Sequence, residues 1–211
     1  MINKLSIIYD LDGTIIDTQK VHDAGWMYAA RSFDVAISED FLLTQRGIPD
    51  EIAALYLLPS DKKKYRIEFA HVKEEYVLSH FEGALFLDGF EESISESLER
   101  KLAIAICTGS SRNFVQAVKN KMPLLEVFSD RIICKEDYRR GKPSGEPLIV
   151  TLQKLNLSSV EAIYVGDAKN DYLCAKNAGV DFVHFGKKDI RTGIPDDVLN
   201  IEDHRSIFSF I

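Results

Sequence analysis

Short apolar runs recur along the chain, and each has the length and composition of a strand that is buried on both faces. They span residues 5–9, 102–107, 131–134, 162–165 and 182–185. Segments with the helical spacing of apolar positions separate the later runs, as at Leu148, Leu152 and Leu155. Because strands and helices alternate after residue 88, the pattern predicts an α/β fold with helices covering a parallel sheet.

The interval between the first two strands has a different pattern. Residues 18–84 contain amphipathic stretches and no convincing strand, and the longest stretch is marked by Tyr65, Phe69, Val72 and Tyr76. A parallel crossover needs only about a dozen residues. We therefore interpret residues 18–84 as a small helical domain inserted into a sheet domain of residues 1–17 and 85–211, with Gly83 and Gly89 at the return.

Composition narrows the class of protein. The 211 residues are 45% hydrophobic and 28% charged, which is typical of a water-soluble globular chain. A net charge of -7 argues against a nucleic-acid surface, because such surfaces depend on Lys and Arg. No run approaches the ~20 apolar residues of a membrane span, and the first ten residues resemble a strand rather than a signal peptide. We expect a cytoplasmic monomer or weak homodimer that binds neither membrane nor nucleic acid.

The three cysteines, Cys107, Cys134 and Cys174, have neither metal-type nor redox-type spacing. Two of them end apolar runs. We expect buried, reduced thiols.

Polar residues follow three of the predicted strands. The first strand leads into Asp10 and Asp12, the second into Thr108, and a later one into Asp167. Open α/β sheets bind their ligands at the carboxyl ends of the strands. We therefore expect these residues to converge on one crevice.

The carboxylates among them predict a metal site. Asp10 and Asp12 are separated by one residue, so their side chains share a face of an extended backbone. Asp167 adds a third carboxylate, and Asp171 adds a fourth just inside the following helix. Neighbouring carboxylates repel unless a cation or a proton intervenes, and oxygen ligands suit Mg²⁺.

A phosphate site is predicted next to them. Thr108, Gly109 and Ser110 lead into a helix that begins near Arg112, which offers hydroxyls and free backbone N–H groups at a helix N-terminus. Lys142 supplies a cation that could neutralise a phosphate or a nucleophilic carboxylate. Together the groups indicate phosphoryl transfer from a small phosphorylated metabolite.

In this order the residues resemble the four motifs of the haloacid dehalogenase superfamily of phosphatases and related enzymes. The matching segments are Asp10-Leu11-Asp12-Gly13-Thr14, Thr108 within residues 106–110, Lys142 within residues 141–143, and residues 166–171. An insertion between the first two motifs is similar to the branch with a helical cap, which includes phosphoglycolate phosphatase-like enzymes and β-phosphoglucomutase. The resemblance implies a doubly wound, three-layer, Rossmann-like core and a helical-bundle cap.

The resemblance also implies roles. Asp10 attacks phosphorus and becomes an aspartyl phosphate, while Asp12 protonates the leaving oxygen and later activates water. Asp12 must then hold a proton while Asp10 stays ionised. The Asp10 side chain, the Asp12 carbonyl and Asp167 would hold Mg²⁺, with Asp171 nearby. Thr108, the Gly109 amide and Lys142 would grip the phosphoryl group, and Ser110 is a further candidate for binding substrate.

Two residues of the inserted segment are candidates for substrate binding. His22 resembles a histidine of the β-phosphoglucomutase branch that faces the active site, whereas Trp26 is expected to be buried packing. Arg46 lies in a stretch that looks like the specificity loop of that branch, and it would contact a substrate anion or form a surface salt bridge. The mutase would carry another basic residue just after this loop, where this chain has Asp50.

Three functions stay open on these grounds. A small-molecule phosphatase leads, because all four motifs are present. A sugar-phosphate mutase is supported by His22 and the cap resemblance. A non-enzymatic phosphate-binding or signalling module is the third, since doubly wound sheets with a phosphorylatable aspartate also serve as receivers. The apolar C-terminal segment, residues 203–211, is expected to dock on the core.

Overall fold

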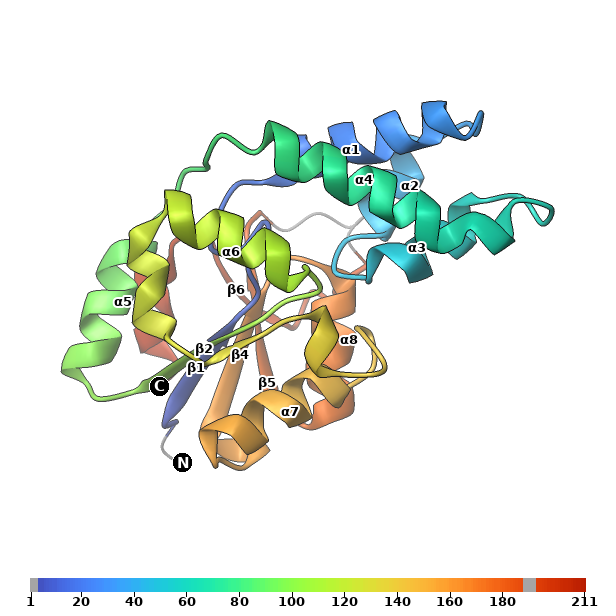
Figure 1. Cartoon of the computed structure of the whole chain (residues 1–211). Helices are drawn as coiled ribbons and strands as arrows, with labels where there is room; N and C mark the ends of the chain where they lie inside the picture. Colours follow the sequence, from blue (N-terminus) through green and yellow to red (C-terminus); the bar gives the residue numbers. More distant parts are fainter. Residues whose placement is uncertain (1–3, 188–192) are drawn as a thin grey trace.

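The computed structural model describes residues 4–187 and 193–211, and its centre is a parallel sheet (Figure 1). The strands are β1 (Ser6–Tyr9), β2 (Ala103–Cys107), β3 (Ile132–Ile133), β4 (Ala162–Gly166), β5 (Asp181–Phe185) and β6 (Leu199–Ile201). They lie in the order β3-β2-β1-β4-β5-β6, with Ile7 of β1 opposite Ile104 of β2 and Ile163 of β4. The predicted α/β fold is therefore confirmed. The short strand β6 was not predicted.

Helices cover both faces of this sheet. They are α5 (Phe90–Glu99), α6 (Arg112–Lys121), α7 (Glu146–Leu155) and α8 (Lys169–Ala178). Alternate side chains of β1 point to opposite faces, so Ile7 packs in the apolar cluster with α5 and α6, and Ile8 packs in the cluster with α7 and α8. The sheet is thus doubly wound. Cys107, Cys134 and Cys174 are buried and unpaired, as expected.

The long interval between β1 and β2 folds into helices that pack on one another, seen as the blue to green group at the top of Figure 1. They are α1 (Gln19–Ser32), α2 (Glu39–Thr44), α3 (Asp50–Leu57), the short 3-10 helix η1 (Lys63–Tyr65) and α4 (Arg66–His80). Trp26, Phe69 and Ala53 belong to an apolar cluster of their own. The expectation that Trp26 is buried packing is confirmed, because its side chain is 0% exposed.

Two backbone segments connect the helices to the sheet, and they lie side by side. The Asp17 N–H donates to the Leu85 carbonyl and the Leu87 N–H donates to the Ile15 carbonyl, at 3.1 and 2.9 Å. Gly13 turns the outgoing segment with a φ of 78°. This pairing places the helices beside the carboxyl ends of β1 and β2.

The C-terminal segment docks on the core, as predicted. Its 3-10 helix η6 (His204–Ser209) follows β6, and Ile207 is 0% exposed among the side chains of the α5 face. The remaining 3-10 helices are η2 (Pro123–Phe128), η3 (Lys135–Asp137) and η4 (Ser159–Glu161). Across the described residues, no helix combines the length and apolar character needed to cross a membrane.

Candidate active site

A pocket lies between the carboxyl ends of the strands and the helices α1–α4. The sheet side contributes Asp10, Asp12, Thr108, Gly109, Ser110, Ser111, Phe114 and Lys135. The helical side contributes Gln19, His22, Trp26, Gln45, Arg46, Gly47, Ile48, Asp50, Lys73, Glu74 and Val77. The pocket therefore brings together seven of the ten site residues that the sequence predicts. The other three, Lys142, Asp167 and Asp171, are grouped around Asp10.

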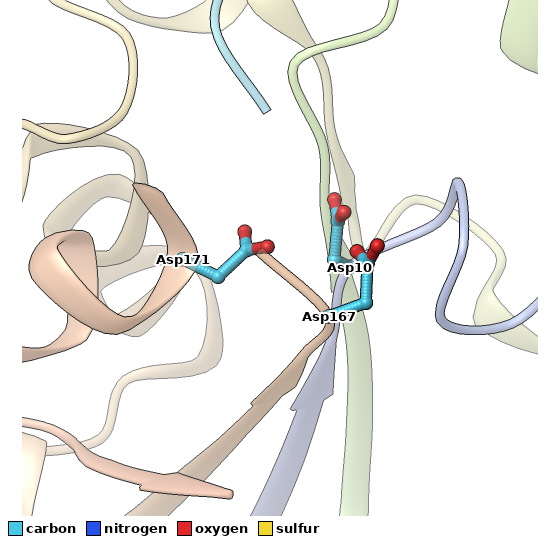
Figure 2. A group of neighbouring side chains, drawn as sticks. All are labelled: Asp10, Asp167 and Asp171. Carbon is cyan, nitrogen blue, oxygen red and sulfur yellow. The ribbon is translucent and has the colours of Figure 1, made fainter. Parts of the chain in front are cut away.

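Three carboxylates gather at the end of β1 (Figure 2). Asp10 follows β1, Asp167 follows β4 and Asp171 lies in the first turn of α8, and one oxygen from each lies within 4.8 Å of the others. The Asp12 side chain is not part of this group. Three clustered oxygen donors on a rigid sheet edge form a set that could hold a metal ion.

Lys142 supplies the cation of this cluster. Its Nζ lies 2.7 Å from Asp10 Oδ1 and 2.6 Å from Asp171 Oδ1, and the residue is 2% exposed. A lysine before a proline usually lies on the surface, so here the tertiary contacts override the local pattern. Asp171 is also fixed by the Tyr164 hydroxyl at 2.8 Å and by the Ala168 N–H at 3.1 Å.

The electrostatics of the cluster favour a further cation. Burial raises the pKa of Asp10 well above its usual range although Lys142 opposes the shift. Burial and the Asp171 charge raise the pKa of Asp167 to about 7. One ammonium group therefore does not balance the carboxylates, and a divalent cation fits the donor set.

Asp12 lies in a contrasting environment. Thr18 Oγ1 donates to its Oδ1 and Ser110 Oγ donates to its Oδ2, each at 2.5 Å, and His22 Nε2 lies 3.3 Å from Oδ1. Burial alone would raise the pKa of Asp12, but His22 and the two hydroxyls lower it below its usual value. These contacts favour the carboxylate form of Asp12, and the expectation that Asp12 holds a proton beside an ionised Asp10 stays a prediction. Hydrogen-bond donors stabilise the Asp12 carboxylate, whereas burial among carboxylates destabilises that of Asp10.

His22 is held from its other side by residues that the sequence analysis missed. Lys73 Nζ lies 2.9 Å from His22 Nδ1, and it also lies 3.0 and 2.9 Å from the two carboxylate oxygens of Asp50. Because an ammonium group only donates, Nδ1 accepts and Nε2 carries the hydrogen that faces Asp12. Lys73 stands among exposed charged residues of an amphipathic helix, so the sequence carries no local signal for its role.

Arg46 reaches the cluster from the loop between α2 and α3. Asn170 Nδ2 donates to its carbonyl at 2.7 Å, and the Arg46 charge lowers the pKa of Asp167 against the effect of burial. Its Nε is buried without a hydrogen-bond partner. No ion pair joins Arg46 to another described residue, and both interpretations of its side chain stay predictions. A Cβ on Gly109 would lie 3.2 Å from the Gly47 carbonyl. The loop after β2 and the loop between α2 and α3 therefore approach each other closely.

Comparisons with known proteins agree with this arrangement. The family model of the haloacid dehalogenase-like hydrolases matches residues 7–185. A phosphorylated carbohydrates phosphatase of Thermotoga maritima is 22% identical, over 93% of this chain and 97% of its own. A pyrophosphatase PpaX of Bacillus velezensis is 27% identical, over 82% of this chain and 79% of its own.

Solved structures share the fold. The β-phosphoglucomutase of Clostridium difficile has a TM-score of 0.80 at 20% identity, covering 98% of this chain and 95% of its own. A hydrolase from Pseudomonas syringae has a TM-score of 0.80 at 19% identity, covering 98% and 97%. With the family model matched over most of its length, the chain belongs to the haloacid dehalogenase-like hydrolase family.

Proposed function

We propose that this hydrolase is a magnesium-dependent phosphatase that cleaves a small phosphomonoester through an aspartyl phosphate on Asp10. The observation that carries the proposal is the position of Asp10. Its carboxylate lines the pocket, contacts Lys142 at 2.7 Å and belongs to the carboxylate triad. The name of one relative, a phosphorylated carbohydrates phosphatase, agrees with it.

The proposal assigns residues 18–84 to a cap domain and residues 1–17 and 85–211 to the catalytic core. The separate apolar cluster around Trp26 and Phe69 supports this division, as does the paired exit and return of the chain at Ile15 and Leu87. A cap that contributes half of the pocket lining would exclude water and contact the leaving group.

Asp10, Asp167 and the Asp12 carbonyl would hold Mg²⁺, with Asp171 close by. Bound Mg²⁺ would neutralise the carboxylates and draw charge from the phosphoryl oxygens, which suits phosphoryl transfer. Asp171 is already shared by Lys142 and the Tyr164 hydroxyl. Its part is therefore to position Lys142 and to support the site.

The protein side chains then carry the two steps. An Asp10 oxygen attacks phosphorus, the bond from phosphorus to the leaving oxygen breaks, and the proton of Asp12 passes to that oxygen. In the second step Asp12 takes a proton from water as the water oxygen attacks phosphorus. This releases phosphate and restores the Asp10 carboxylate. Thr108, the Gly109 N–H and Lys142 stabilise the phosphoryl charge throughout.

His22 would control the proton on Asp12. In the described geometry its Nε2 faces Asp12 and stabilises the carboxylate. A histidine positioned in this way favours the ionised form of Asp12, which accepts a proton from water. Movement of α1 away from Asp12 would favour the protonated form of Asp12. We therefore treat His22 as a positioning residue.

The test is phosphate release from a panel of phosphomonoesters with Mg²⁺ and with EDTA. We expect turnover that needs Mg²⁺ and falls at least about 1,000-fold in Asp10→Asn, because the nucleophile is lost. Asp61→Asn makes the same change at an exposed aspartate and should retain the activity of the unchanged protein. Turnover that survives in Asp10→Asn would contradict the proposal. Isomerisation of a sugar phosphate without phosphate release would instead identify a mutase.

A further inference from the structure

The leaving group would occupy the side of the pocket next to α3 and α4, and the charges there are informative about the substrate. Lys73 and Lys135 provide two cations, and Asp50 and Glu74 provide two carboxylates. A second anionic group on the substrate would need a cation on this side that is not already ion-paired. A leaving group at this position presupposes the proposed phosphatase function.

Lys73 has no N–H group left for a substrate anion. Its ammonium group has three N–H donors, and three acceptors surround it: His22 Nδ1 at 2.9 Å and the Asp50 oxygens at 3.0 and 2.9 Å. The residue is 3% exposed. Asp50 therefore neutralises the cation that Lys73 contributes to the pocket.

Lys135 is also matched by carboxylates. Its Nζ lies 3.5 Å from Glu74 Oε2. Burial lowers the pKa of Lys135, but the surrounding carboxylates, Glu74 foremost, raise it above its usual value. Glu74 is held in place because Ser111 Oγ donates a short hydrogen bond to its Oε1. Ser111 in turn caps α6 by accepting from the Phe114 N–H at 3.1 Å.

Arg46 is the remaining cation of the pocket lining, and it acts on the opposite side. Asn170 Nδ2 donates to its carbonyl at 2.7 Å, and a Cβ on Gly47 beside it would lie 3.6 Å from Lys142 Cδ and 3.8 Å from Asp171 Oδ1. Arg46 is therefore placed to meet the phosphoryl group that is transferred rather than the group that leaves.

We propose that the substrate is the phosphomonoester of an uncharged, hydroxyl-bearing alcohol, and that Asp50 and Glu74 select against a second phosphate or a carboxylate. Their carboxylates retain lone pairs that accept hydrogen bonds from hydroxyls. An anionic leaving group would instead face the carboxylates of Asp50 and Glu74, and the cations beside them are already ion-paired. Like charges placed in this way are an effective means to reject a competing substrate. Trp26, Val77 and Phe114 provide an apolar wall for carbon atoms.

Matched pairs of substrates test this proposal. Glycerol 3-phosphate and 3-phosphoglycerate differ in whether the leaving group carries a carboxylate, and fructose 6-phosphate and fructose 1,6-bisphosphate differ by a second phosphate. We expect kcat/KM in Mg²⁺ to favour the uncharged leaving group by about 10-fold or more in each pair. Equal values or a preference for the anionic member would overturn the proposal.

Substitution of Asp50 and Glu74 tests whether these two carboxylates cause the preference for an uncharged leaving group. Asp50→Asn and Glu74→Gln should each move the kcat/KM ratio by about 10-fold towards the anionic member, because Lys73 or Lys135 is released. The ratio is measured within one preparation, so it does not depend on the folded fraction. The matched controls are Asp61→Asn and Glu75→Gln, which change exposed carboxylates and should leave the ratio unchanged. A ratio that does not move in Asp50→Asn and Glu74→Gln would overturn the assignment.

Binding to the Asp10→Asn variant separates this proposal from the proposed phosphatase function. Isothermal titration with each pair in Mg²⁺ measures the preference without turnover. Tighter binding of the uncharged member, with no turnover by the unchanged protein, would support the leaving-group assignment and contradict the phosphatase. Turnover with a preference for anionic members would support the phosphatase and contradict the leaving-group assignment. Tighter binding of the anionic member would overturn the assignment whatever the activity.

Discussion

His204 is a buried histidine held among aromatic rings, and at the scale of the residue it links stability to pH. Its Nε2–H donates to the Thr14 carbonyl at 2.7 Å, and its ring stacks on Phe185 with 4.2 Å between centroids. Tyr9 and Phe90 pack on it edge-on, and its Nδ1 has no hydrogen-bond partner. A proton on Nδ1 would therefore place a charge in an apolar site.

Burial lowers the pKa of His204 from 6.5 to about 4. Between these pH values the unfolded chain binds a proton that the folded chain does not, so acid reduces the free energy of unfolding. We expect His204 to contribute up to about 1.4 kcal/mol of this loss per pH unit. Urea unfolding followed by circular dichroism at pH 7, 6 and 5 measures it.

In this experiment His204→Gln should be less stable at pH 7 and should lose less stability as the pH falls. His71→Gln, on the exposed outer side of α4, is the matched control and should keep the slope of the unchanged protein. The same slope in His204→Gln and the unchanged protein would show that this residue does not carry the pH dependence.

At the scale of elements, the junction where α5 begins joins the return segment to the C-terminal 3-10 helix. Gly89 precedes α5 with a φ of 74°, and a Cβ there would overlap the carboxylate of Asp203. Asp203 is held by the Arg205 N–H at 2.8 Å, and the His204 N–H donates to the Asp88 carbonyl at 2.9 Å. The start of α5 and the start of η6 are therefore packed as one unit.

Gly89→Ala tests this junction. A left-handed conformation costs alanine about 1–2 kcal/mol, and displacement of Asp203 should add roughly 1–2 kcal/mol. Gly179→Ala is the matched control, because Gly179 ends α8 with a φ of 68° and a Cβ there meets only Ser159 Oγ at 3.6 Å. Urea unfolding should show a larger loss for Gly89→Ala. Equal losses would mean that the contact with Asp203 is not tight.

At the scale of the whole molecule, stability and the metal site are linked. The chain carries a net charge of -7, and its carboxylate triad brings segments from β1, β4 and α8 together at one sheet edge. A ligand that binds only the folded state stabilises the whole chain by mass action. Mg²⁺ binding should therefore appear in global unfolding and not only in activity.

We expect the midpoint of thermal unfolding to rise by roughly 5–10 °C when Mg²⁺ reaches about 100 times its Kd. NaCl at equal ionic strength should give a much smaller rise, because it screens charge without filling the site. In Asp167→Asn the rise produced by Mg²⁺ should be mostly lost. Calorimetry measures the midpoint with Mg²⁺, with NaCl and in the Asp167→Asn variant. An unchanged midpoint with Mg²⁺ would contradict a resident magnesium site.

Much of the architecture could be predicted from sequence, because apolar runs and their spacing report burial directly. The five predicted strands correspond to β1–β5, and residues 18–84 form helices. The strand β6 was missed because its three residues at the sheet edge are only partly buried and carry little pattern. The predicted crevice at the strand ends was also found, since parallel strands place their carboxyl ends on one edge.

By itself the sequence determined which residues offer chemistry: the aspartates after β1 and β4, the Thr108 turn and Lys142. Only the tertiary structure decided how their charges are paired. The neighbouring sequence does not indicate the roles of Lys73, Glu74 and Lys135. These roles arise because α4 lies across the pocket from α6 and η3. The pKa shifts of Asp10 and Asp12 were also beyond the reach of the sequence, for the same reason. Burial and hydrogen bonds come from residues distant in the chain, and a one-dimensional pattern does not contain those distances.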